Sequence, residues 1–252
     1  MLLSPNKPHK SYLICAVQRS GSSLLCEALK NTGLAGNPEE YFLDGQGWED
    51  GEWAHQHHVT TRPDYLKLVF NHGTSPNGVF GAKIMWNYFP IMIEKLTALP
   101  GYQGWPAPQI ILDLLPNVQF IWMVRRDKVR QAVSWARAAQ TDVYAWHKNT
   151  APAPKQEPCF DFSFIDNLHR LVLEGEAGWQ SFFVACGKEP IKVIYEDLVD
   201  DYEGTALRIL DALKIPYPIA IQFQERKLQK QADSLNDLWV EQYLRMKKQN
   251  HQ

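Results

Sequence analysis

The sequence carries almost no net charge and has no polybasic stretch. Its 252 residues include 26 lysines and arginines against 28 aspartates and glutamates, which gives a formal charge of −2 at pH 7. General binding of nucleic acids or of anionic membranes depends on summed positive charge, so the composition argues against both. Any phosphate group that the protein binds is therefore expected to be held by a few local residues.

Features of membrane and exported proteins are lacking as well. The longest apolar runs, such as residues 11–17 and 120–124, are far shorter than the roughly 20 residues that cross a bilayer. The N-terminus shows no charged leader followed by an apolar stretch, so we expect no membrane anchor and no secretory signal. The cysteines form no C-x-x-C pair, which favours reduced cysteines in a cytoplasmic protein. There are four of them: Cys15, Cys26, Cys159 and Cys186.

Four short apolar runs have the length of buried β-strands, and longer segments with helical spacing separate them. This alternation predicts a single α/β domain over residues 1–252, with a mostly parallel sheet of four or five strands flanked by helices. The predicted strands are residues 12–17, 79–85, 118–124 and 191–195. Helices are predicted after residue 23 with Gly33 as the closing residue, and over residues 63–71, 88–99, 127–139, 164–185, 203–213 and 234–247. Two stretches, residues 36–58 and 149–158, are predicted to be loops.

The first predicted strand runs into Gln18-Arg19-Ser20-Gly21-Ser22-Ser23, a short polar turn that leads straight into a helix. Unpaired N–H groups and the positive end of the helix dipole make such a helix start suitable for binding phosphate. The turn is not a Walker A loop, because G-x-x-x-x-G-K-[ST] is absent, and G-x-G-x-x-G is absent too. The spacing leaves two interpretations open: an anion-binding loop that works without metal, and a structural turn with a serine N-cap.

A second group of cationic residues follows the third predicted strand. Arg125 and Arg126 come directly after it, and Ser134 lies about two helical turns further on. In an open α/β sheet, ligands bind beyond the carboxyl ends of the strands, so Arg19 and these two arginines are expected at one edge. Ser134 is then expected to meet one of the arginine head groups over a shared phosphate, unless it is an ordinary surface serine.

Taken in order, several blocks of the sequence resemble the bacterial trehalose 2-sulfotransferase family. They are QRSGSSLLCEAL (18–29), GLAGNPEEYF (33–42), PNGVFGAKIMWN (76–87), RRDKVRQAVSW (125–135) and Gln140-Thr141, within a similarity that extends from about Tyr12 to Trp239. The resemblance implies a three-layer P-loop-like fold and a sulfotransferase that uses 3′-phosphoadenosine 5′-phosphosulfate (PAPS). Such an enzyme moves a sulfuryl group to a hydroxyl of a trehalose-like disaccharide, or of a related sugar or small alcohol, and releases PAP. It also implies a homodimer.

The resemblance places the sulfuryl donor on the turn and on the helix after the third strand. Arg125 and Ser134 match the residues that hold the 3′-phosphate, with Arg126 as an alternate by a shorter spacing. Tyr195 matches an aromatic residue near the adenine. The 5′-phosphosulfate loop corresponds to Arg19, Ser20, Gly21, Ser22 and Ser23, and Arg19 would stabilise charge on the departing phosphate.

A C-terminal segment, Lys230 to Asp233 with Trp239, resembles one that closes over the nucleotide. Lys230 stands where the family is expected to have arginine. A lysine keeps the charge but cannot make the bidentate contact of a guanidinium, which leaves its role open.

The resemblance places the acceptor on the segment after the first helix. Glu40 matches the general base of the family, and Glu39 is its competitor on position alone. Candidates for contact with the sugar are Gln18, Asn37, Pro38, Glu39, Glu40 and Tyr41. The family has an acidic residue at the position of Asn37. An amide both donates and accepts hydrogen bonds, whereas a carboxylate only accepts them, so the two bind sugar hydroxyls differently.

Other signals are weaker. Lys83 is a candidate for contact with the sulfonate or the acceptor, or a strand-end charge in solvent. The histidines at 55, 57 and 58 lack the spacing of a tetrahedral metal site, so we expect no metal. Two further functions remain as alternatives: a small-molecule kinase, which the missing G-K-[ST] disfavours, and a non-catalytic nucleotide-binding module.

Overall fold

The strands form where the sequence has its apolar runs. In the computed structural model, which describes residues 8–43, 48–144, 153–228 and 234–250, they are β1 (Lys10–Ala16), β2 (Val79–Met85), β3 (Gln119–Val124) and β4 (Ile191–Ile194). All pair in parallel, in the order β2-β1-β3-β4. Strand β1 is an inner strand, and its Ile14 lies beside Lys83 of β2 and Ile121 of β3. The turn that follows β1 is therefore bordered by the chain segments that follow β2 and β3.

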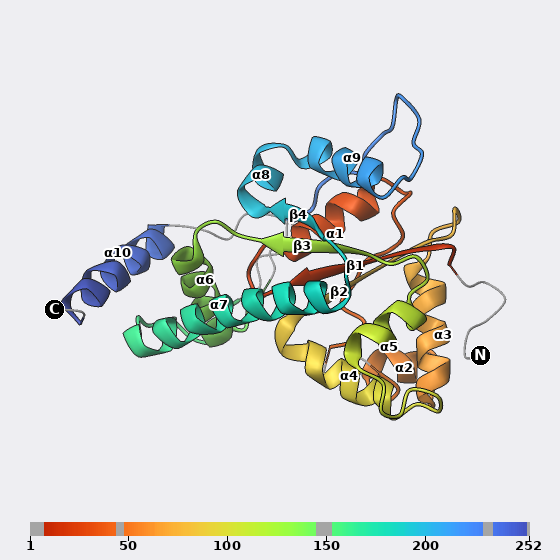
Figure 1. The fold of residues 1–252 in the computed structure, drawn as a ribbon. Coiled ribbons are helices and arrows are strands. Elements are labelled where there is room, and N and C mark those ends of the chain that lie inside the picture. Colours follow the sequence, from red (N-terminus) through yellow and green to blue (C-terminus); the bar gives the residue numbers. More distant parts are fainter. Residues whose placement is uncertain (1–7, 44–47, 145–152, 229–233, 251–252) are drawn as a thin grey trace.

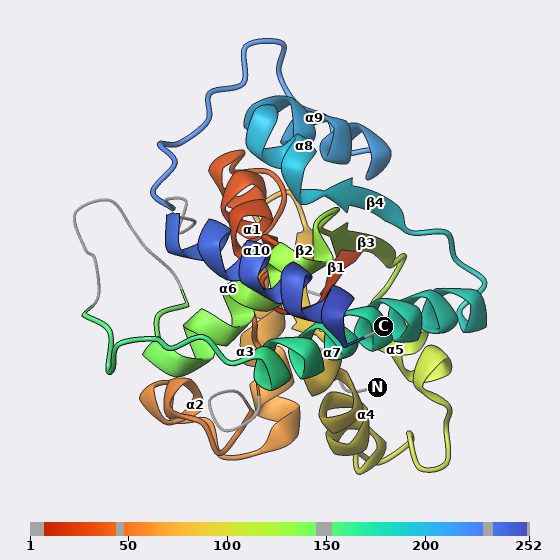
Figure 2. The same cartoon turned by 90° about the vertical axis from the view of Figure 1, so that its left-hand side faces the viewer.

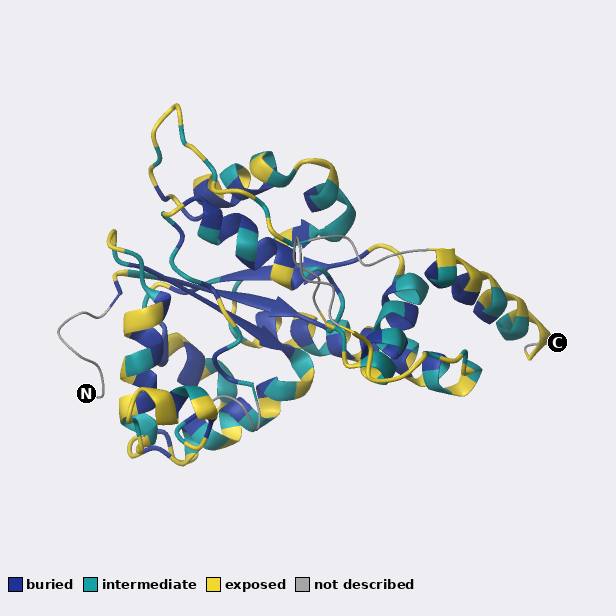
Figure 3. Ribbon diagram, turned by 180° about the vertical axis from the view of Figure 1, so that it is seen from behind, coloured by how far each residue is buried: buried dark blue, intermediate teal, exposed yellow. Residues whose placement is uncertain are grey.

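Helices cover both faces of the sheet (Figure 1). Alternate residues such as Tyr12 and Ile14 pack toward α1 (Ser22–Asn31), α8 (Tyr195–Asp200) and α9 (Tyr202–Ala212). Their neighbours, such as Leu13 and Cys15, pack on the other face. That face carries α3 (Arg62–Gly73), α4 (Phe89–Thr97), α5 (Ala107–Leu114) and α7 (Phe162–Ala185). Strands β1, β2 and β3 are the most deeply buried part of the chain (Figure 3), and β4 at the edge is partly buried. The predicted three-layer architecture with a central parallel sheet is confirmed.

A smaller apolar cluster lies beyond the carboxyl ends of the strands. Here α6 (Lys128–Thr141), the start of α7 and α10 (Ser234–Gln249) bury Val133, Ile165 and Trp239. Figure 2 looks onto this side, with α10 across the front. The predicted closing segment, residues 230–233, lies outside the described residues. None of the described helices is long and apolar enough to cross a membrane, and the four cysteines are free.

Three predictions about secondary structure were wrong. Residues 36–58 were expected to be a loop but contain α2 (Glu52–Gln56), and helices α5 and α8 were not expected. Helix α2 is too short to show a period, and it is held by the ring of Trp53, which packs on Tyr41 with the ring centres 5.7 Å apart. Helix α5 begins among prolines that read as loop residues. The other predicted helices are present, with ends within two residues of those expected.

Two glycines bound α1. Gly21 is the N-cap with φ of 93°, and no side chain caps the helix, so the serine N-cap is wrong. At the other end Gly33 has φ of 69° and donates its N–H to the Lys30 carbonyl at 2.9 Å, as predicted for a closing glycine. Their surroundings differ. A β-carbon on Gly21 would lie 2.3 Å from Cδ2 of Tyr195, whereas one on Gly33 would meet nothing within 4 Å.

This contrast gives a matched pair of substitutions. Gly33→Ala is expected to lower the free energy of unfolding by about 1–2 kcal/mol, the cost of a left-handed backbone for a residue with a β-carbon. Gly21→Ala is expected to lower it further, because the Tyr195 ring must also move. Urea unfolding of both variants measures the difference. Equal losses would show that the ring does not constrain the turn.

Candidate functional site

The turn after β1, residues 18–23, lies at the carboxyl edge of the sheet and is fixed from both sides. The Gln18 carbonyl accepts a hydrogen bond from Nε2 of Gln131 in α6 at 2.8 Å, and the Gln18 side chain donates to Asn87, which follows β2. The Ser20 hydroxyl is buried and has no hydrogen-bond partner among the described residues. Buried polar groups are nearly always paired, so an unpaired hydroxyl here fits a turn that receives a polar ligand.

Arg19 occupies the left-handed region with φ of 61°. Its Nε donates to the Ser134 hydroxyl at 3.0 Å, and its guanidinium also donates to the Tyr144 carbonyl at 2.5 Å. Burial and the neighbouring Arg125 cation lower the pKa of Arg19 to about 10. An anion bound between the two arginines would reduce this unfavourable interaction.

Arg125 lies beneath the turn and Arg126 lies on the surface. The guanidinium of Arg125 is buried and stacks over the Tyr195 ring at 4.7 Å, with Nε 3.9 Å from Glu196. Burial lowers the pKa of Arg125. Arg126 is exposed and pairs with Asp197 at 2.5 Å. The two arginines therefore lie in different surroundings. Arg125, which was preferred from the sequence, is the arginine that faces the turn.

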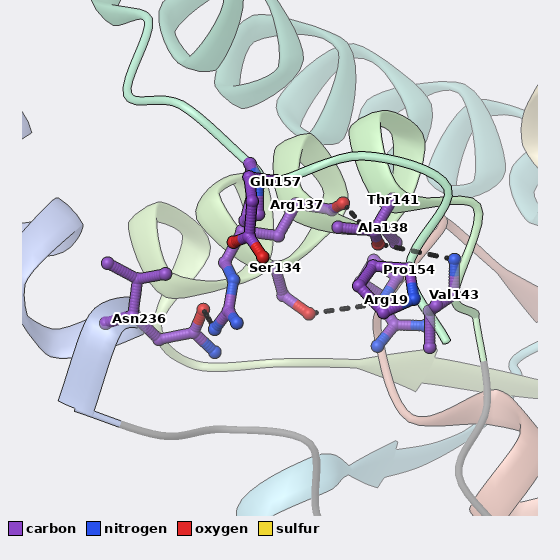
Figure 4. A pocket seen from close by; sticks show the side chains of 11 residues that line it. Arg19, Ser134, Arg137, Ala138, Thr141, Val143, Pro154, Glu157 and Asn236 are labelled. Carbon is purple, nitrogen blue, oxygen red and sulfur yellow. Dashed lines mark hydrogen bonds between the residues drawn. The ribbon is translucent and has the colours of Figure 1, made fainter. Parts of the chain in front are cut away.

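Ser134 was predicted to share a phosphate with Arg125 or Arg126, which stays a prediction; in the structure its hydroxyl accepts a hydrogen bond from Arg19. It borders a cavity of about 200 Å³ between α6, residues 154–158 and the start of α10 (Figure 4). Sequence reasoning missed Arg137, which also borders this cavity and donates to Oδ1 of Asn236 at 2.6 Å. Its position three residues after Ser134 on one helix was the signal that could have found it.

Glu39 and Glu40 point in different directions because their segment runs along β2. The Lys83 N–H donates to the Glu39 carbonyl at 2.9 Å, a bridge that places successive side chains on opposite faces. Glu39 points to Lys30, with about half of its side chain exposed. The Glu40 carboxylate instead lies 2.9 Å from the ammonium of Lys83.

Lys83 connects Glu40 to the turn. Its ammonium also lies 3.4 Å from the Ser23 hydroxyl at the start of α1. The alternative of a strand-end charge in solvent is wrong, because Lys83 is only 7% exposed. Burial acts to lower the pKa of Lys83, but the Glu40 carboxylate together with Cys26 and Glu39 acts to raise it, and the net result is a raised pKa. The structure thus assembles a carboxylate, an ammonium and a hydroxyl at the end of the turn.

The remaining acceptor candidates support this segment. Tyr41 is buried against Trp53 and His72, and its hydroxyl donates to the Asn37 carbonyl. Pro38 is buried as well, and Asn37 is half-buried. These contacts fix the backbone that carries Glu40. Among the described residues, no group of three or more His, Cys, Asp or Glu side chains is placed to hold a metal ion.

Comparison with known proteins identifies the family. The family model described as Stf0 sulphotransferase matches residues 11–246. Two curated proteins, each named trehalose 2-sulfotransferase, are both 31% identical over 93% of this chain and 94% of their own; they come from Mycobacterium tuberculosis and Mycolicibacterium smegmatis. A solved sulfotransferase domain of the Synechococcus PCC 7002 olefin synthase aligns over 94% of this chain and 95% of its own, at 14% identity and with a TM-score of 0.38. On the family match and the two relatives, the chain belongs to the Stf0 sulphotransferase family and is a sulfotransferase.

Proposed function

We propose that this sulfotransferase takes its sulfuryl group from PAPS and transfers it to a hydroxyl of trehalose or of a related sugar or small alcohol. Both curated relatives carry trehalose in their names. The observation that carries the proposal is the contact of the buried Lys83 with both Glu40 and the turn at Ser23. It places a carboxylate able to accept a proton next to a helix start able to bind an anion.

The residues around the turn fit the donor. The unpaired Ser20 hydroxyl, the backbone N–H groups at the start of α1 and Arg19 would hold the 5′-phosphosulfate. Ser134 and the buried Arg125 would hold the 3′-phosphate, which keeps the donor in line for transfer. Tyr195, stacked on Arg125, would lie near the adenine. Bound there, PAPS supplies the sulfuryl group and a PAP leaving group.

Glu40 is the proposed general base. As the acceptor oxygen attacks sulfur, the proton of its hydroxyl passes to the Glu40 carboxylate, and the bond between sulfur and the phosphate oxygen breaks with its electron pair left on PAP. Arg19 faces the phosphate end, where negative charge develops. Glu39 is disfavoured for this role, since its side chain is paired with Lys30 on the exposed side of the segment.

The family resemblance also implies a homodimer, and the cysteine pattern favours a cytoplasmic protein; we include both in the proposal. Sedimentation of the purified protein would give twice the 29.0 kDa mass of one chain.

The function is tested by incubating the protein with PAPS and a panel of sugars and small alcohols, with trehalose first. Release of PAP together with a sulfated acceptor, seen by mass spectrometry, is the expected result. ATP with Mg²⁺ serves as the control for a kinase. Phosphorylated product from ATP, with no product from PAPS, would contradict the proposed donor.

Glu40→Gln is expected to reduce kcat by about 10²–10⁴-fold, the usual contribution of a general base. The affinity for PAP is expected to stay within about twofold, because the amide keeps the shape of the side chain. Glu39→Gln, one residue away, is the matched control and is expected to keep kcat. A comparable loss of kcat in both variants would argue against Glu40 as the base.

Arg125→Ala is expected to remove most of the thermal stabilisation by PAP. A ligand at 100 times its dissociation constant adds about 2.7 kcal/mol, and each kcal/mol raises the Tm of a chain of this size by roughly 2–4 °C. Each variant is compared with its own Tm without PAP, so that lost stability is not mistaken for lost binding. Arg126→Ala is the control and should keep the full shift. If Arg126→Ala loses the shift and Arg125→Ala keeps it, the alternate assignment is the correct one.

A further inference from the structure

Lys83 makes a second contact beyond its ion pair with Glu40. Among the described residues, Lys83 and Arg125 are the charged side chains that are buried. An ammonium has three donors, and Lys83 directs two of them to groups of different function: Glu40 at 2.9 Å and the Ser23 hydroxyl at 3.4 Å. It therefore lies between the proposed base and the proposed donor loop.

A donor on the loop would bring a second anion to the same ammonium. Ser23 belongs to the first turn of α1, where backbone N–H groups attract anions. A sulfonate held beside Ser23 would lie next to the ammonium of Lys83, which already forms an ion pair with Glu40. The side chain of Lys83 is 8% exposed and that of Glu40 is 22% exposed. The lysine is thus fixed in the protein, while the carboxylate has an open side toward which it can turn.

We propose that Lys83 acts as a clamp for which Glu40 and the donor sulfonate compete. This inference rests on the proposed function. Without donor, Lys83 holds the Glu40 carboxylate in the ion pair. With donor bound, the ammonium turns to a sulfonate oxygen and Glu40 is released toward the acceptor hydroxyl. Lys83 neither gains nor loses a proton. The proton of the hydroxyl passes to Glu40 as the bond between sulfur and the acceptor oxygen forms and the bond between sulfur and the phosphate oxygen breaks.

The clamp makes a prediction about binding that is independent of turnover. PAP lacks the sulfonate, so titration calorimetry with PAPS and with PAP, both without acceptor, isolates the contact. Lys83→Met is expected to weaken the binding of PAPS by about tenfold or more, which corresponds to the loss of one hydrogen bond to a charged group. Its affinity for PAP should stay within about twofold. Lys83→Arg keeps the charge and should recover part of the preference for PAPS.

Glu40→Gln provides the second arm of the experiment. Because the amide competes weakly for the ammonium, this variant is expected to bind PAPS several-fold more tightly than the wild type and PAP equally well. The neighbouring pair of Lys30 and Glu39 provides the matched controls. Lys30→Met and Glu39→Gln remove an ion pair of the same kind on the exposed side, and both should leave the two affinities unchanged.

The outcomes separate the two proposals. If Lys83→Met weakens the binding of PAPS and of PAP equally, Lys83 has only a structural role and the clamp is overturned. An unchanged affinity for PAPS in Glu40→Gln would also overturn the clamp. In either case, wild-type binding and sulfuryl transfer would leave the proposed function standing. If the wild type binds neither nucleotide, the donor assignment fails and the clamp falls with it.

Discussion

Two buried cations at the carboxyl edge of an apolar sheet are the constraint on which the site depends. A charge taken out of water is costly unless it is paired. Lys83 is compensated by Glu40, which fixes the position of the segment after α1. Arg125 is compensated by the face of Tyr195 and by Glu196, which brings the start of α8 to the turn. The same contacts leave Tyr195 so close to Gly21 that no side chain fits there. The shape of the turn follows from the need to accommodate these two charges.

Much of the fold could be predicted because apolar runs bounded by polar turns report buried strands directly. The shared edge of Arg19 and Arg125 follows from the rule that ligands bind beyond the carboxyl ends of parallel strands, whereas the strand order β2-β1-β3-β4 was not predicted. Helices α2, α5 and α8 could not be predicted. They have eight residues or fewer, and helices of that length depend on tertiary packing more than on local sequence.

The site could be predicted in composition but not in pairing. Sequence spacing brought the arginines and Ser134 to one edge, yet it did not reveal that Ser134 pairs with Arg19. It also did not separate Glu39 from Glu40. Their difference arises because the segment forms a parallel bridge to β2, so that successive side chains point to opposite faces. The burial of Lys83 depends on the same bridge. The position of the Arg137 side chain depends on its hydrogen bond to α10, which lies far along the chain. Such contacts join distant segments, and no local pattern records them.

The position of α10 has a consequence for synthesis of the protein on the ribosome. The sheet, the turn after β1 and α6 are complete before α10 emerges, since it is the last described element. Asn236 at its start completes the wall of the cavity beside Ser134 and holds Arg137 there. A nascent chain that ends before α10 therefore carries the anion-binding turn but lacks one side of this cavity. The complete cavity can therefore form only after α10 has been synthesised.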